Sequence, residues 1–238
     1  MDGVKFLGFD VFGTVVDWRS SVARELRPFL ERHGLAQLDP AAFADEWRGM
    51  YQPSMDPIRR GARPWTRLSV LHRENLETVL GRHGIDAARV GEAELAAITR
   101  AWERLDPWPD SVPGLTRLKT RFALGTISNG NIGLMMWLAR HGGLPWDVIA
   151  GAEATRTYKP QPETYLGTAD LLGLQPGECA LVAAHNDDLA AARACGFKTA
   201  FIPRPAEHGP GQSSDLAAEE AWDVVAEDLT DLARRLGC

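Results

Sequence analysis

The second half of the chain alternates short apolar runs with helical patterns, and this alternation constrains the fold more than any other feature. Apolar runs of strand length occur at 121–128, 146–151, 179–184 and 198–203, and helical segments separate them. Parallel strands need crossover connections of this kind, because successive strands must run in the same direction. The pattern therefore predicts an α/β protein with a parallel sheet and helices on both of its faces.

The first apolar run, residues 4–10, has no strand partner nearby in the sequence. The stretch that follows it, 18–103, instead carries apolar residues at helical spacing. We therefore expect the first strand to join the later sheet and to complete a Rossmann-like core domain from residues 1–15 plus 109–238. Residues 16–108 are then predicted to be an inserted, all-helical cap domain.

Local signals divide these regions further. Asp39-Pro40 is a favourable start for a helix, because proline is tolerated in the first turn. The segment "DPWPDSVPG" at 106–114 is rich in proline and glycine and is predicted to be a hinge or linker. The segment "PRPAEHGPGQSSD" at 203–215 is predicted to be a mobile loop.

Composition excludes several classes of partner. The net charge of −6 leaves no basic surplus to neutralise nucleic-acid phosphates. No apolar run approaches the roughly 18 residues of a membrane span, and no signal peptide is recognised. Three unpatterned cysteines fit a reducing compartment without disulfides, so the cytoplasm is expected. The apolar segment 134–146 leaves a homodimer open.

Polar residues gather where the predicted strands end. Asp10 follows the first run, Ser128-Asn129 ends the second, and residues 183–188 follow the run that begins at Cys179. Ligands of open α/β sheets bind outside the carboxyl ends of the strands, so these residues are expected to meet at one edge. No P-loop is present, and no G-x-G-x-x-G follows the first strand, so the sequence offers no support for nucleotide binding.

Four motifs at these positions resemble those of the haloacid dehalogenase superfamily. They are "FDVFGT", "TISNG", "YKPQPETY" and "LVAAHNDDLAAARACGF", in this order along the chain. The resemblance covers the whole predicted core, and the predicted cap lies where that superfamily has one. It implies that Asp10 is a nucleophile.

Two departures bear on the reaction. Phosphatases of the superfamily carry a second aspartate, the general acid, where this chain has Phe12, and a Mg²⁺ ligand where it has Ala184. A departing halide needs no proton, and a monoanionic haloacid needs no Mg²⁺. The sequence therefore resembles the type II (L-2-haloacid) dehalogenases. The resemblance implies a hydrolase that opens the carbon–halogen bond of a small anionic halogenated acid through an aspartyl ester, without cofactor or metal.

The resemblance also implies roles for the motif residues. Asp10 attacks C2 of the substrate, and water then hydrolyses the ester. Lys159 lowers the pKa of Asp10, because a nearby positive charge favours the ionised carboxylate. Asp188 orients Lys159 or the water. Ser128 holds the substrate carboxylate and Asn129 receives the halide.

Further candidates surround this set. Thr14 offers a hydrogen bond at the same edge, and Arg48 is the cap residue that best matches the family's halide-binding arginine. Arg59, Arg60 and Arg63 are rivals for that role. Apolar walls for the halide could come from Phe12, Trp47 and Trp65.

The fourth motif differs from the best-known dehalogenases, which have Ser and Asn where this chain has Ala183 and His185. His185 could accept a proton from the attacking water or donate one to the halide. The other five histidines are expected at the surface. Two alternatives remain open at this point, a phosphatase or phosphonatase-like hydrolase and a non-catalytic member of the fold.

Overall fold

The computed structural model describes residues 1–238 and contains a six-stranded parallel sheet with the strand order β5-β4-β1-β6-β7-β8. The first strand lies in the middle of this sheet, with Leu7 paired to Leu124 on one side and to Ala180 on the other. The predicted α/β fold is therefore confirmed, including the long-range pairing of the first strand. The strands are β1 (Phe6–Phe9), β4 (Ala123–Ser128), β5 (Val148–Gly151), β6 (Cys179–Ala183), β7 (Lys198–Phe201) and β8 (Val224–Val225).

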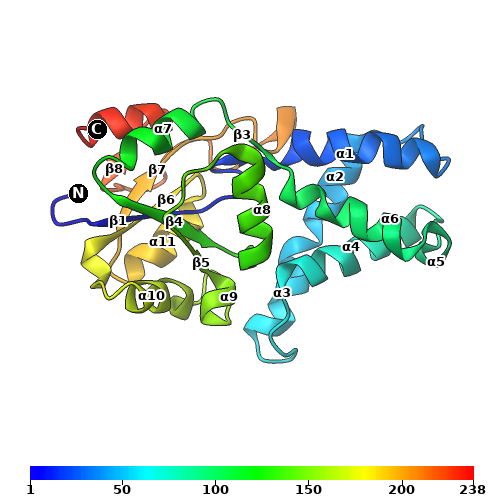
Figure 1. The fold of residues 1–238 in the computed structure, drawn as a ribbon, viewed down its shortest axis with the longest axis horizontal. Coiled ribbons are helices and arrows are strands. Elements are labelled where there is room, and N and C mark those ends of the chain that lie inside the picture. The colour runs from blue at the N-terminus through cyan, green and yellow to red at the C-terminus, as the bar shows by residue number, and fades with distance from the viewer.

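Helices cover both faces of the sheet (Figure 1). Side chains of β1 alternate between the two faces, as in any strand, so Leu7 and Phe9 join a core of 48 residues while Phe6 joins a second core of 12. The larger core lies under α7, α8 and α12, and the smaller one under α10 and α11. These helices and short turns are α7 (Ser111–Leu118), α8 (Ile132–Gly142), α9 (Ala152–Thr155), α10 (Pro162–Leu171), η2 (Pro176–Glu178), α11 (Asn186–Ala194), η3 (Gly209–Gly211) and α12 (Leu229–Arg235).

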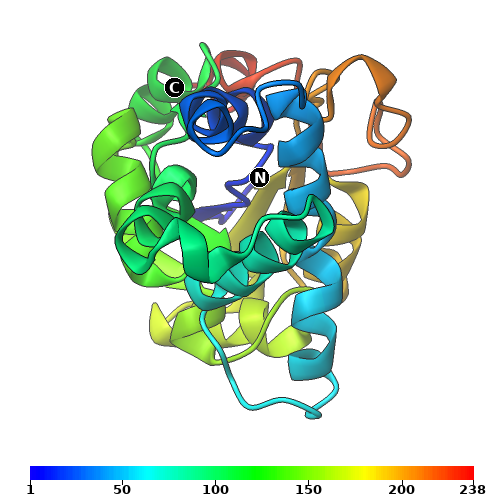
Figure 2. The ribbon, with the colours of Figure 1, turned by 90° about the vertical axis from the view of Figure 1, so that its right-hand side faces the viewer.

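The helices of residues 18–103 form a separate group, which we call the helical lobe; it lies on the right of Figure 1 and faces the viewer in Figure 2. A short antiparallel pair of strands, in which Val16 faces Pro107, lies where the chain enters and leaves this lobe. The core of 48 residues runs from the sheet into the lobe without a break. The elements are β2 (Val16–Asp17), α1 (Trp18–Arg32), α2 (Pro40–Gly49), α3 (Tyr51–Arg59), α4 (Leu68–Arg82), α5 (Ala87–Val90), α6 (Glu92–Thr99), η1 (Arg100–Glu103) and β3 (Asp106–Pro107).

An aspartate side chain caps three of the helices in the lobe, α1, α2 and α5. Asp39 accepts a hydrogen bond from the Ala41 backbone N–H at 3.1 Å, and Pro40 occupies the first position of α2, as predicted. The predicted linker at 106–114 is only partly correct, because α7 begins at Ser111. Its proline, Pro113, lies in the first turn, where no intrahelical N–H bond is lost.

No helix combines the length and the apolar character needed to cross a bilayer. The three cysteines are free thiols. Burial raises the pKa of the Cys179 thiol to about 11, so this residue behaves as a small apolar side chain of the smaller core.

Candidate active site

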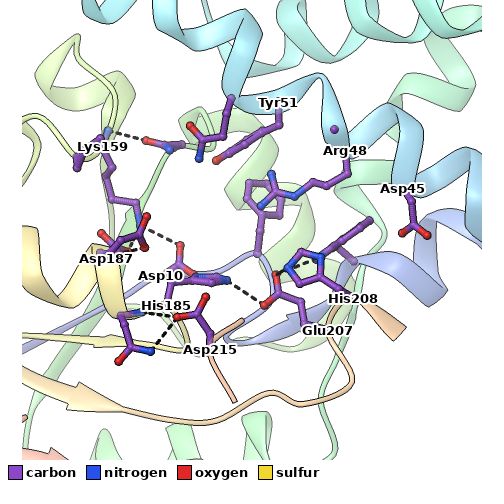
Figure 3. Close-up of a pocket in the computed structure, with 18 of the residues that line it drawn as sticks. Asp10, Asp45, Arg48, Tyr51, Lys159, His185, Asp187, Glu207, His208 and Asp215 are labelled. Carbon is purple, nitrogen blue, oxygen red and sulfur yellow. Dashed lines mark hydrogen bonds and ion pairs between the residues drawn. The ribbon is translucent and has the colours of Figure 1, made fainter. Parts of the chain in front are cut away.

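A cavity of about 610 Å³ lies between the sheet edge and the helical lobe. Asp10, directly after β1, and His185, two residues after the end of β6, line it from the sheet side, and Arg48 and Tyr51 line it from the lobe (Figure 3). The carboxyl ends of the parallel strands therefore form the floor of the cavity, as predicted, and the helices α2 and α3 form its roof.

A buried lysine joins two carboxylates in the floor. The Lys159 ammonium donates a hydrogen bond to Asp10 Oδ1 at 2.9 Å and another to Asp188 Oδ2. Burial alone would raise the pKa of Asp10, but the charges of Lys159 and His185 outweigh it and hold that pKa well below its usual range. Burial likewise opposes the charge on Lys159, yet the two carboxylates keep its pKa above the usual value. Asp10 is therefore ionised at any physiological pH.

The second oxygen of Asp10 has its own donors. Thr14 Oγ1 donates to Asp10 Oδ2 at 2.8 Å, and His185 Nδ1 lies 3.1 Å from the same oxygen. The other ring nitrogen of His185, Nε2, lies 2.9 Å from Glu207 Oε2. Burial disfavours the charged imidazolium, but Glu207 and Asp10 together raise the pKa of His185 well above its usual value. His185 is therefore a cation between two anions.

The loop that brings Glu207 to His185 is packed against the site. Arg204 donates to the Thr14 backbone oxygen at 2.9 Å and forms a two-pronged ion pair with Asp110. The Trp18 indole N–H donates to the buried Glu207 at 3.1 Å. The sequence predicts only a mobile loop here, so the contribution of these residues to the site was missed.

Arg48 lies among aromatic rings on the roof. Its guanidinium carbon is 3.8 Å from the centre of the Tyr51 ring and 5.9 Å from that of Phe12. The Nη1 atom is buried and has no hydrogen-bond partner. A buried charged donor without a partner is costly, so the arrangement favours an anionic ligand at this place.

The other predicted site residues lie at different distances from the cavity. Asn129 lines it, and its side-chain oxygen accepts the backbone N–H of Lys159 at 2.8 Å. Ser128 is buried, and its hydroxyl oxygen accepts the Gly130 N–H at 3.0 Å. Trp47 does not line the cavity, because successive helical residues point in different directions and its indole is turned into the lobe, where it donates to the His72 backbone oxygen.

Arg59, one of the rival arginines, and His72, one of the histidines expected at the surface, both have contacts inside the protein. All three nitrogens of the Arg59 guanidinium already have partners, so this side chain is not free to bind a halide. Its Nε donates to the Lys159 backbone oxygen at 2.8 Å, and its two other nitrogens donate to Asp56 and Gln52. The prediction that His72 lies at the surface is wrong. Its imidazole is buried and stacks on Trp102, with 4.3 Å between ring centres.

Comparison with known proteins identifies the family. The family model of haloacid dehalogenase-like hydrolases matches residues 4–196. The chain belongs to the haloacid dehalogenase-like hydrolases. The resemblance inferred from the four motifs is thereby confirmed.

Several members of this family resemble the chain over most or part of its length. The defluorinating L-2-haloacid dehalogenase Rha0230 is 53% identical, with 99% of this chain and 96% of that one covered and a TM-score of 0.96. The L-2-haloacid dehalogenase PA0810 is 50% identical, with 98% and 99% covered and a TM-score of 0.91. A (S)-2-haloacid dehalogenase of Xanthobacter autotrophicus is 31% identical over 56% of this chain, and the match spans 51% of that relative.

The donor set of this haloacid dehalogenase-like hydrolase does not fit a divalent cation. No three His, Cys, Asp or Glu side chains are grouped so that they could hold a metal ion. Ala184 offers no side-chain ligand where the phosphatase motif has one. The ammonium of Lys159 pairs with both Asp10 and Asp188 and so already occupies the place between them that a cation would take. Mg²⁺ prefers a shell of hard oxygens, which these residues do not leave free.

Proposed function

We propose that this protein is a hydrolytic 2-haloacid dehalogenase. It converts short 2-haloalkanoic acids, such as haloacetates and L-2-halopropionate, into the 2-hydroxy acid and a halide. The observation that carries the proposal is the pair of Asp10 and Lys159, which forms an ionised nucleophile without a proton donor two residues later, where Phe12 stands. The half-identical L-2-haloacid dehalogenases support the same substrate class and the L isomer.

The first step is an in-line attack of Asp10 on C2 of the substrate. The carboxylate forms a C–O bond as the carbon–halogen bond breaks, and the halide leaves with the bonding electrons. Oδ1 accepts one hydrogen bond and Oδ2 accepts two, so Oδ1 keeps a lone pair free for the attack. We assign the leaving halide to Asn129 and the unpartnered Nη1 of Arg48, and the substrate carboxylate to the neighbourhood of Ser128.

The second step is attack of water on the ester carbonyl of Asp10, which releases the hydroxy acid. Asp188 stands beside Lys159 and is a candidate acceptor for the water proton, because burial raises the pKa of its carboxyl above the usual value. The Tyr165 hydroxyl donates to Asp188 at 2.5 Å and fixes its orientation. No proton donor is needed for the halide in either step.

Halide release in the presence of EDTA tests the proposal. The panel contains chloro-, bromo- and fluoroacetate, both enantiomers of 2-chloropropionate and a phosphate monoester. We expect halide release that excess chelator leaves unchanged, a preference for the L enantiomer and no phosphate release. Turnover of the phosphate ester alone, and only with added Mg²⁺, would instead identify a phosphatase.

Replacement of Arg48 by alanine tests the halide site. Loss of one preorganised donor from the leaving group is expected to lower the rate of halide release on the order of 10²-fold. Arg60, which is exposed, provides the matched control, and Arg60→Ala should keep the wild-type rate. Equal rates for the two variants in single-turnover measurements would remove Arg48 from the halide site.

Two further expectations stay proposals. The three free thiols support a reducing compartment, and we propose the cytoplasm. A homodimer also remains a prediction. It is supported by exposed apolar side chains on α8, namely Ile132, Met136 and Trp137.

A further inference from the structure

The two oxygens of Asp10 have different surroundings, and this difference matters after the first step. Oδ1 faces Lys159, while Oδ2 faces the Thr14 hydroxyl and His185 Nδ1. If Oδ1 attacks the substrate, as the proposed function has it, Oδ1 becomes the bridging oxygen of the ester. Oδ2 then becomes the carbonyl oxygen, on which negative charge develops when water attacks.

We propose that Thr14 and His185 form an oxyanion site for hydrolysis of the Asp10 ester, and that Glu207 is the positioning residue that keeps His185 a donor. This inference rests on the proposed function and assigns the water-attack step to residues of this chain. Both donors lie within 3.1 Å of Oδ2 in the resting site, so no rearrangement is needed when the charge appears.

The direction of the Thr14 hydroxyl is fixed by a second bond. The backbone N–H of Ala184 donates to Thr14 Oγ1 at 2.9 Å. A hydroxyl has a single proton, and with one lone pair occupied by this N–H, the proton points at Asp10 Oδ2. Thr14 is fully buried, so water does not compete for that bond.

The charge of His185 after ester formation depends on which neighbouring carboxylates are still ionised. In the resting site, two carboxylates face the imidazolium, Asp10 from β1 and Glu207 from the loop 203–215. Alkylation neutralises Asp10, and from then on Glu207 alone holds the proton on His185. Other charged groups lie near the pair. They are Lys159 beyond Asp10, Asp187 and Asp188 in the first turn of α11, and Arg48 and His208, both of which face Glu207.

The hydrolysis step balances with the groups present. Water attacks Cγ of Asp10, one of its protons passes to Asp188, and the carbonyl electrons move onto Oδ2. Collapse restores the carbonyl and breaks the Cγ–Oδ1 bond. The departing alkoxide takes a proton from Lys159, which Asp188 then reprotonates. Asp10 is left as a carboxylic acid with one oxygen from water, and it loses its proton to solvent.

This assignment differs from a role of His185 as the base that activates water. A base must be neutral, and its ring nitrogen toward the ester must carry no proton. His185 is instead held between two carboxylates in its protonated form. An oxyanion donor loses its function when pH rises and the imidazolium deprotonates, whereas a base loses it when pH falls. The two roles therefore predict opposite limbs of the pH profile for ester hydrolysis.

Rapid-quench kinetics of Thr14→Val and Glu207→Gln, with chloroacetate in excess over the enzyme, test the proposal. We expect Thr14→Val to release halide in a burst equal to the concentration of active sites and then to hydrolyse the ester on the order of 10²-fold more slowly. The ester should accumulate on Asp10, where acid quenching and mass spectrometry detect it. Thr14→Ser keeps the hydroxyl and should restore hydrolysis.

Glu207→Gln tests the positioning role. The alkaline limb of the hydrolysis profile should move to lower pH by at least about one unit, because one of the two charges that hold the proton is lost. His141→Gln and Glu77→Gln change half-exposed ion pairs whose residues do not line the cavity, and they serve as matched controls. Thermal unfolding of every variant shows whether a slow reaction comes from misfolded protein or from folded protein in which one step is slowed.

Three results would overturn the proposal. One is equal slowing of halide release and ester hydrolysis in Thr14→Val, without accumulation of ester. Another is a hydrolysis rate in the wild-type protein that falls on the acidic side with the titration of His185. The third is an alkaline limb that Glu207→Gln leaves in place. Absence of both halide release and an Asp10 adduct in the wild-type protein would instead contradict the proposed function itself.

Discussion

Asp10→Asn is expected to abolish dehalogenation, with a loss of at least about 10⁴-fold in turnover, as for removal of other catalytic nucleophiles. The amide nitrogen of asparagine has no lone pair available for attack on carbon, and its oxygen carries no net charge. Halide release under saturating chloroacetate measures the loss. The acid-quenched wild-type protein should carry the mass of a carboxymethyl ester on the peptide that contains residue 10, and the variant should not.

A matched substitution shows whether the effect belongs to the nucleophile. Asp170 is exposed on α10, and Asp170→Asn should keep the wild-type rate. Substantial halide release by Asp10→Asn, after hydrolysis of the amide back to aspartate has been excluded by mass, would show that another group performs the attack.

Lys159→Met is expected to give the second largest loss, on the order of 10³-fold or more at pH 7. Without the ammonium, Asp10 and Asp188 share a buried site as two like charges, and one of them must take up a proton. The wild-type rate of halide release should stay constant far into the acid range, because the pKa of Asp10 is held well below its usual range. In the variant, the acid limb should move to higher pH.

The same substitution should also destabilise the fold. Removal of one partner from a buried ion pair typically costs about 3–5 kcal/mol, because a charge is left without compensation. In the wild-type protein, the depressed pKa of Asp10 contributes stability above about pH 4, which is lost as the carboxyl protonates. In the variant, a buried carboxylate takes up a proton at a higher pH than in the wild-type protein. The difference in free energy of unfolding between the two proteins should therefore become smaller as the pH is lowered from 7 to 5.

Urea unfolding at the two pH values measures this deficit. Lys198→Met removes a partly exposed lysine, whose ammonium lies 3.4 Å from Asp223, and is the matched control. It should cost no more than about 1 kcal/mol at either pH. If the Lys159→Met variant is as stable as this control, the Lys159 ammonium does not stabilise the carboxylates of Asp10 and Asp188 in the folded protein.

Most of the sheet could be predicted from the sequence, because buried parallel strands are continuous apolar runs. The run at 179–184 contains β6, and the run at 121–128 contains β4. Helix α3 was not predicted. Its sequence, "YQPSMDPIR", contains two prolines, which disfavour a helix, although Tyr51, Met55 and Ile58 follow helical spacing and pack against the core.

The residues of the site likewise fall into those that a sequence motif predicts and those that it does not. Asp10, Lys159 and Asp188 were predicted because each belongs to a motif with a fixed place relative to a strand. Glu207 was not, since a loop without periodicity carries no signal for the residues it will contact. Its position follows from the ion pair of Arg204 with Asp110, nearly a hundred residues earlier in the chain. Pairings of this kind become visible only when the chain is folded.

The loop 203–215 lies beyond residue 196, where the match to the family model ends. A chimera that transplanted the four motifs of this protein into a distant relative would therefore import the nucleophile and its lysine but leave the carboxylate behind His185 to the recipient. Transfer of the whole reactive assembly would require co-grafting of this loop together with Trp18 and Asp110, which anchor it. If Glu207 has the proposed role, substitutions in this loop should change the rate of ester hydrolysis and leave the rate of halide release unchanged.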